Sequence, residues 1–294
     1  MKLLKNFEIN AETKLACLIG DPIEKSFSPK IHNAWFNYFK LNCVYLAFKI
    51  PSFKLKEAID GLRILNVIGF NVTIPHKISI INFLDEIDSK AKNIGAINTV
   101  LNKNGKFIGF NTDIDGVFFA FDKSNVSINN NTCLIIGAGG AAKACAHAFS
   151  IRKCKKIIIL NRSLEKAILL SKEIKEKYNI ESLYGELNKE NIEKFSNMSD
   201  IIVNATPLGS YYSLNESIFP KDFLRKDLVV FDVVYNPIKT KLIKDAIDKG
   251  AKIVYGIDML IGQAAKAFKI WTGLDPPIEI AFKIIKSELE KNEK

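Results

Sequence analysis

The chain has 294 residues, of which 48% are apolar and 25% are charged, and its 42 basic and 32 acidic residues give a formal net charge of +10. This length predicts two domains with separate cores, and the composition excludes a disordered or fibrous protein. Because the lysines are dispersed and no aromatic residues alternate with them, the charge favours a lysine-rich surface over a nucleic-acid partner.

No stretch of the sequence predicts a membrane span. The longest uncharged apolar stretch, from Cys133 to Ala142, falls well short of the ~20 residues that a bilayer requires. The first residues, Met1 to Glu8, become polar too soon for the apolar core of a signal peptide. We therefore expect a cytoplasmic protein.

The cysteines and histidines predict neither disulfide bonds nor a metal site. Five cysteines are an odd number and contain no C-x-x-C pair, and the three histidines lack metal-binding spacing. The cysteines are interpreted as small core residues: Cys17, Cys43, Cys133, Cys145 and Cys154.

Short apolar runs alternate with helical stretches along the chain, a pattern typical of an α/β protein. In the first third we predict helices near 29–41 and 53–65. Asn104-Gly105 predicts a hairpin turn. The strands predicted here are 15–20, 44–48, 67–73, 98–101 and 107–110.

A second series of strands predicts a doubly wound parallel sheet of the Rossmann type. We place the start of this nucleotide-binding domain at residue 113 and its end at 257. The helical residues 258–294 are expected to return to a substrate-binding and catalytic domain formed by 1–112. The strands of the second series are predicted at 132–136, 157–160, 200–205, 228–233 and 252–255.

A glycine-rich loop follows the first strand of the second series and precedes an alanine-rich helix. In this loop, Gly137 permits a tight turn, Gly139 lets the backbone approach a pyrophosphate, and Ala142 allows close packing of helix on strand. This arrangement predicts a site for a nicotinamide dinucleotide at Gly137-Ala138-Gly139-Gly140-Ala141-Ala142.

The end of the next strand bears on the choice of cofactor. An NAD-binding domain places an acid there, whereas this chain has Asn161-Arg162-Ser163 followed by Lys166. A guanidinium binds a 2′-phosphate that a carboxylate would repel, so NADP is favoured. The alternative is that Arg162 is a solvated charge and Ser163 a helix N-cap.

Lys77 and Asp113 are candidates for proton transfer, since each follows a predicted strand of the first domain. An ammonium held by a carboxylate can deliver a proton to a carbonyl oxygen. From spacing alone, an exposed lysine and an N-cap aspartate explain these residues equally well.

Several spaced motifs together resemble the shikimate dehydrogenase family over nearly the whole chain. Besides the glycine loop and Asn161-Arg162, the motifs run from Gly20 to Asn33, Gly69 to Lys77, Gly95 to Thr99, Asn111 to Asp113, Asn204 to Gly209, Asp232 to Pro237 and Gly256 to Gln263. The resemblance implies NADPH-dependent reduction of 3-dehydroshikimate to shikimate, a step towards chorismate and the aromatic amino acids. It also implies that Lys77 and Asp113 are the catalytic pair.

The resemblance further implies a set of binding residues. Ser26, Ser28 and Tyr235 match the groups that bind the substrate carboxylate, although Ser28 before Pro29 also reads as a simple helix N-cap. The substrate hydroxyls are matched by Asn71, Thr73, Asn98, Asp113 and Gln263. Thr206, Val233, Gly256 and Met259 match the nicotinamide side, and Arg162 and Lys166 match the clamp on the adenosine phosphate.

Two departures from the family pattern concern that clamp. Ser163 stands where threonine is common, and Lys166 where arginine is common, which keeps the sign of the charge. One alternative is a quinate/shikimate dehydrogenase with NAD, which Ser26, Ser28 and Arg162 oppose. Another is a non-catalytic dinucleotide-binding homologue, which the catalytic pair opposes. Family members occur as monomers and dimers, so a monomer or homodimer is expected.

Overall fold

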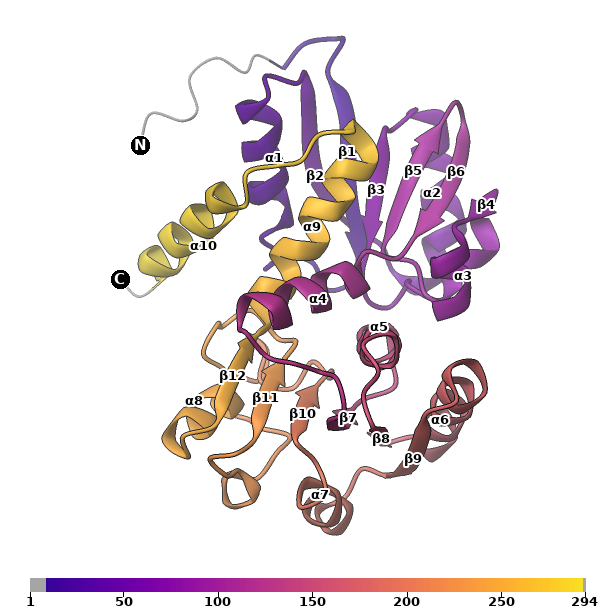
Figure 1. Cartoon of the computed structure of the whole chain (residues 1–294). Coiled ribbons are helices and arrows are strands. Elements are labelled where there is room, and N and C mark those ends of the chain that lie inside the picture. The colour runs from indigo at the N-terminus through magenta and orange to yellow at the C-terminus, as the bar shows by residue number, and fades with distance from the viewer. Residues whose placement is uncertain (1–8, 293–294) are drawn as a thin grey trace. The chain divides into compact units, whose positions relative to one another are not determined.

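The computed structural model describes residues 9–292, which form two compact units (Figure 1). Unit 1 contains the residues up to Thr112 and those from Gln263 onward, and unit 2 runs from Asp113 to Gly262. Residues 1–8, on which the expectation about a signal peptide rests, lie outside the described residues. Within 9–292, no helix has both the length and the hydropathy that crossing a membrane demands.

Unit 1 is built on a six-stranded mixed sheet with the order β2-β1-β3-β5-β6-β4. The first three strands are parallel, and β5 is antiparallel to both β3 and β6. The predicted hairpin turn is confirmed at Asn104 and Gly105, which both have positive φ. The strands are β1 (Lys14–Gly20), β2 (Cys43–Lys49), β3 (Gly69–Val72), β4 (Glu86–Ile87), β5 (Thr99–Lys103) and β6 (Lys106–Phe110).

Helices cover both faces of this sheet, because successive side chains of each strand point to opposite faces and both faces carry apolar residues. Cys17 and Ile19 of β1 pack against α2 (Leu55–Ile64), whereas α1 (Ser28–Tyr38) and the end of α9 (Gly256–Thr272) lie on the other face (Figure 1). The last helix, α10 (Ile278–Asn292), packs on α1. The chain also forms α3 (Ser89–Ile94), which the sequence reading missed together with the two-residue strand β4.

Unit 2 contains six parallel strands in the order β12-β11-β10-β7-β8-β9. From β7 the chain pairs outward to one edge and then crosses to the other, which is the doubly wound order that was predicted. The strands are β7 (Thr132–Ile136), β8 (Lys156–Asn161), β9 (Glu181–Glu186), β10 (Ile201–Asn204), β11 (Val229–Asp232) and β12 (Lys252–Tyr255).

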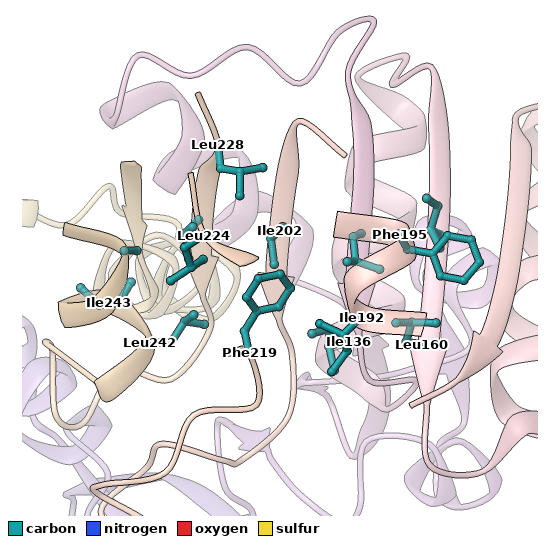
Figure 2. Close-up of a cluster of buried hydrophobic side chains, with 14 residues drawn as sticks. Ile136, Leu160, Ile192, Phe195, Ile202, Phe219, Leu224, Leu228, Leu242 and Ile243 are labelled. Carbon is teal, nitrogen blue, oxygen red and sulfur yellow. The ribbon is translucent and has the colours of Figure 1, made fainter. Parts of the chain in front are cut away.

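The helices of unit 2 pack on strands whose apolar residues are buried. Figure 2 shows the cluster on one face, where Ile192 and Phe195 lie near Leu160 and Phe219 lies beside Ile202. All five cysteines are buried and free, as expected for small core residues. The helices are α4 (Asp113–Lys123), α5 (Gly140–Ile151), α6 (Leu164–Tyr178), α7 (Lys189–Ser196) and α8 (Lys241–Asp248).

Candidate active site

The glycine loop lies between β7 and α5 and takes a shape that requires its first glycine. Gly137 has φ of +118°, and a Cβ atom there would lie 3.0 Å from the carbonyl oxygen of Ala205. Its N–H donates to the carbonyl of Leu160 at 2.8 Å, which ties the loop to the end of β8. A side chain at Gly137 would therefore strain the backbone and press on β10's following residues.

The residues after Gly137 leave backbone donors available. Gly139 is the N-cap of α5 and donates to no described acceptor, and neither do the N–H groups of Gly140 and Ala141. No heavy atom lies within 4 Å of the position where a Cβ of Gly139 would stand. Free amides at the start of a 12-residue helix, with open space before them, suit an anionic group.

Two cations follow β8 beside this loop. Arg162 and Lys166 are exposed, and neither has a carboxylate within ion-pair distance among the described residues. The turn is shaped by Asn161, whose Nδ2 donates to the carbonyl of Ser163 at 3.0 Å. Ser163 does occupy the N-cap position of α6, but its side chain makes no capping hydrogen bond. This end of β8 thus offers unpaired positive charge and a free hydroxyl.

The turn after β10 is held by side chains of neighbouring strands. The Thr206 hydroxyl donates to Asn204 Oδ1 at 2.7 Å and accepts from the N–H of Leu208 at 3.3 Å. Thr206 Cγ2 would lie 3.5 Å from a Cβ at Gly137, so this turn adjoins the glycine loop. The hydroxyl of Thr206 is therefore already engaged within the turn.

A buried acid fixes the same region from β11. Asp232 accepts from Asn204 Nδ2 at 3.0 Å, from the N–H of Val234 at 3.0 Å and from the Thr240 hydroxyl at 2.6 Å. Burial raises the pKa of Asp232 to about 7, although these three donors act in the opposite direction. Asp232 joins the ends of β10 and β11 to the start of α8.

Three further predicted cofactor residues are placed along the same strand ends. Val233 donates its N–H to the carbonyl of Asn204 at 3.0 Å. Gly256 begins α9, and a Cβ there would lie 2.5 Å from the carbonyl oxygens of Asp232 and Val233. Met259 is buried one turn further along α9. Only glycine allows α9 to start so close to β11.

In unit 1, predicted substrate residues meet in a buried polar cluster. Asn71 lies opposite Thr99 across the sheet, and its Nδ2 donates to Thr99 Oγ1 at 3.0 Å and to the carbonyl of Asn98 at 3.1 Å. Asn98 Nδ2 donates to Thr112 Oγ1 at 2.9 Å and to Gln263 Oε1 at 3.3 Å. Neutral donors and acceptors dominate this cluster, and such groups can form hydrogen bonds with the hydroxyls of a ligand.

The serines near the start of α1 also lie together. The N–H of Ser28 donates to Ser26 Oγ at 3.2 Å, and Ser28 is buried. Phe27 occupies the N-cap position and no side chain caps the helix, so the interpretation of Ser28 as an N-cap is wrong. The helix begins one residue earlier than that interpretation requires.

The segment that carries Lys77 is anchored through its backbone. β3 ends at Val72, one residue before the predicted end, and the N–H of Thr73 donates to the carbonyl of Ile19 at 3.0 Å. The carbonyl of Lys77 accepts from the N–H of Ile97 at 2.7 Å. The Lys77 side chain is half-buried, and the hydrogen bond from Ile97 holds the Lys77 backbone beside the residues that precede β5.

The remaining predicted residues belong to unit 2. Asp113 is buried as the first residue of α4, directly after Thr112 of the polar cluster. Tyr235 is half-buried after β11. Sequence reasoning missed Tyr45, whose hydroxyl donates to Asn71 of this cluster, and Trp271, which donates to the carbonyl of Val100 on β5. The signal in the sequence that could have indicated Tyr45 is a tyrosine at a buried position of β2.

Comparison with known proteins gives matches over most of the chain. Residues 18–100 match a shikimate dehydrogenase substrate binding domain, residues 120–240 a shikimate/quinate 5-dehydrogenase domain, and residues 256–281 a shikimate 5′-dehydrogenase C-terminal domain. A shikimate dehydrogenase (NADP(+)) of Methanocaldococcus jannaschii is 47% identical over 96% of this chain and 100% of its own.

Solved structures agree with these matches. A crystal structure of a shikimate dehydrogenase in complex with NADP+ superposes with a TM-score of 0.88 and 45% identity, covering 96% of this chain and 97% of the other. A quinate dehydrogenase of Corynebacterium glutamicum in complex with NAD has a TM-score of 0.85 and 29% identity, covering 94% of this chain and 99% of the other.

Proposed function

The chain belongs to the shikimate dehydrogenase family, and we propose that it catalyses the reversible NADPH-dependent reduction of 3-dehydroshikimate to shikimate. The observation that carries this proposal is the 47% identity to a shikimate dehydrogenase (NADP(+)) along 96% of the chain. The product is an intermediate on the route to chorismate and the aromatic amino acids.

Unit 2 is proposed as the NADP-binding domain. The free amides of Gly139, Gly140 and Ala141 would bind the pyrophosphate, and the unpaired cations Arg162 and Lys166 would bind the 2′-phosphate. Both groups of residues fit the cofactor because they offer donors and positive charge that the protein itself does not consume. When bound, NADPH supplies the hydride.

The nicotinamide side is proposed at Thr206, Val233, Gly256 and Met259. The hydroxyl of Thr206 is engaged with Asn204, so its methyl group and backbone would form the contact surface. Gly256 lets α9 begin directly against the carbonyl of Val233, where a Cβ atom would clash.

Unit 1 is proposed as the substrate-binding and catalytic domain. The hydroxyls of Ser26 and Ser28, helped by the Tyr235 phenol of unit 2, would bind the substrate carboxylate. The hydroxyl groups of the ring would contact the neutral polar cluster, an arrangement suited to a polyol with a single charge. The residues proposed for these hydroxyls are Asn71, Thr73, Asn98, Asp113 and Gln263.

Lys77 and Asp113 are proposed to handle the proton. In the direction of reduction, the Lys77 ammonium donates a proton to the carbonyl oxygen of the substrate as charge develops there. The buried Asp113 carboxylate would orient the substrate hydroxyl and the ammonium. In the reverse direction the same pair would withdraw the proton from the alcohol. We further propose a cytoplasmic monomer or homodimer.

Quinate oxidation with NAD is a second candidate, since a quinate dehydrogenase in complex with NAD matches with a TM-score of 0.85. Arg162 and Lys166 favour NADP, because an NAD site has no phosphate for them to bind.

One set of assays distinguishes the two functions. NADPH absorbance is followed with 3-dehydroshikimate, and the assay is repeated with NADH and with 3-dehydroquinate. We expect the highest kcat/KM for NADPH with 3-dehydroshikimate. Turnover with NADH and 3-dehydroquinate alone would establish the second candidate, and no turnover with any pair would refute both.

A further inference from the structure

Two neighbouring residues of α1 hold one tyrosine of β2 in different ways. Asn33 Nδ2 donates to the carbonyl of Tyr45 at 2.8 Å, and Asn33 Oδ1 accepts from the N–H of Tyr45 at 2.7 Å. The ring of His32 stacks on the Tyr45 ring with centroids 4.4 Å apart and planes 11° apart. Backbone and ring of Tyr45 are thus both fixed from α1.

His32 contributes to this contact as an uncharged aromatic ring that stacks on Tyr45. It is fully buried, neither ring nitrogen has a hydrogen-bond partner among the described residues, and burial lowers the pKa of His32 to about 3. Trp35, Phe268 and Trp271 surround it at centroid distances of 5.5, 6.3 and 5.2 Å. The imidazole is therefore neutral near pH 7 and packs between other rings.

The sheet leaves room for Tyr45 by placing small residues beside it. Tyr45, Ala16 and Gly69 are in register across β2, β1 and β3. A Cβ at Gly69 would lie 2.3 Å from Trp271 Nε1, which instead donates to the carbonyl of Val100 at 2.9 Å. This row keeps both large rings on the face that carries Asn71.

The hydroxyl of Tyr45 donates to Asn71 Oδ1 at 2.8 Å, and this contact is buried. Both protons of Asn71 Nδ2 are already donated, to the Asn98 carbonyl and to Thr99 Oγ1. An amide with both donors used and one oxygen lone pair engaged retains one acceptor site. Asn71 can therefore receive a hydrogen bond from a ligand but has no proton to give.

We propose that Tyr45, held by His32 and Asn33, is a positioning residue that fixes Asn71 as an acceptor for a hydroxyl group of the bound polyol. The inference rests on the proposed function, in which Asn71 contacts the substrate. It assigns a role to the His32-Asn33 pair, which closes the motif beginning at Gly20 and contributes no group to the proposed substrate contacts.

The test is a double-mutant cycle with Tyr45→Phe and Asn71→Ala, because a residue acting through Asn71 loses its effect once Asn71 is truncated. Tyr45→Phe keeps the ring stack and removes one oxygen. We expect it to raise the KM for shikimate roughly 3- to 10-fold, in line with one lost hydrogen bond, with kcat changed less than about twofold. The KM for NADP should stay constant. In the Asn71→Ala background the same substitution should leave kcat/KM within about twofold.

Tyr178→Phe is the matched control, since the Tyr178 hydroxyl also makes a 2.8 Å hydrogen bond, to His147 Nδ1, but lies in unit 2. It should leave the KM for shikimate unchanged. Thermal melting checks that each variant folds. Were Tyr45→Phe too unstable, Asn33→Ala would disturb the same tyrosine from α1 and should raise the KM for shikimate.

Each outcome has one meaning. An unchanged KM in folded Tyr45→Phe, or an equal loss of kcat/KM with and without Asn71, would overturn the inference while the wild-type chain remains active. Absence of turnover by the wild-type chain would instead refute the proposed function, and with it the role of Asn71.

Discussion

Replacing Glu173 with glutamine should lower the free energy of unfolding of unit 2 by about 3 kcal/mol at pH 7. Glu173 lies on α6 and accepts from His147 Nε2 at 3.1 Å and from the ammonium groups of Lys143 at 3.0 Å and Lys177 at 2.8 Å. His147 and Lys143 lie on α5, so this carboxylate joins the two helices that follow the glycine loop and the Arg162 turn.

The magnitude follows from the pKa of the carboxyl group. Burial raises the pKa of Glu173, but the hydrogen bonds from His147, Lys177 and Lys143 outweigh burial and lower it from 4.5 to about 2. At about 1.4 kcal/mol for each tenfold change in proton affinity, this difference corresponds to about 3 kcal/mol. The side chain is 18% exposed, so solvent screens the interaction only in part.

The direction of the pKa shift of Glu173 predicts how its contribution to stability depends on pH. Because the folded protein binds this proton more weakly than the unfolded chain, the stabilisation is complete above about pH 4.5 and is lost as the pH falls towards 2. Urea unfolding followed by circular dichroism at pH 7, 5, 4 and 3 measures the difference between wild type and Glu173→Gln. We expect this difference to shrink below pH 5.

A neighbouring carboxylate supplies the control. Glu176 is exposed on the same helix, and its oxygen lies 3.8 Å from Lys172 Nζ. Glu176→Gln should change stability by less than about 0.5 kcal/mol at any pH. A loss in Glu173→Gln that matched this control, or that stayed constant from pH 7 to pH 3, would refute the reasoning.

The other predictions concern catalysis, cofactor choice and packing. Lys77→Ala should lower kcat by about two to four orders of magnitude with a modest change in the KM for 3-dehydroshikimate, and an unchanged kcat in steady-state assays would remove Lys77 from catalysis. Arg162→Ala should raise the KM for NADPH roughly 10- to 100-fold, and an equal loss for NADH would contradict the phosphate clamp. Gly69→Ala should cost about 1–3 kcal/mol in thermal unfolding because its Cβ would displace Trp271, whereas Gly61→Ala, with open space around it, should be neutral or stabilising.

How far the sequence predicts the fold depends on how completely each element is buried. β7 and β12 were predicted with their observed bounds. β9 was missed because it is an edge strand with half-exposed residues and has Gly185 in its interior. The C-terminal helix begins at Gly256, two residues before the expected start at 258, because glycine permits the close approach to Val233.

For the candidate site, prediction from the sequence succeeds where residues are close together in the chain and fails where they meet only through the fold. Residues grouped in short motifs, such as the glycine loop, were predictable because strand, turn and helix are adjacent in the chain. Tyr45 and Trp271 were not, since Tyr45 reaches Asn71 only through the pairing of β2 with β1, and Trp271 reaches Gly69 and Val100 only through the return of α9. The roles assigned to Lys77 and Asp113 stay predictions until kinetics test them.

The interrupted path of unit 1 has a consequence for synthesis on the ribosome. Residues 9–112 emerge first, but their sheet receives Trp271 over Gly69, and Trp35 donates to the carbonyl of Pro277 at 2.9 Å, only after unit 2 has been translated. Unit 2 is continuous in sequence and can fold as soon as it leaves the exit tunnel. All residues of unit 2 are therefore translated before those that complete unit 1, and a chain released before residue 263 lacks the segment that packs Trp271 against the sheet of unit 1.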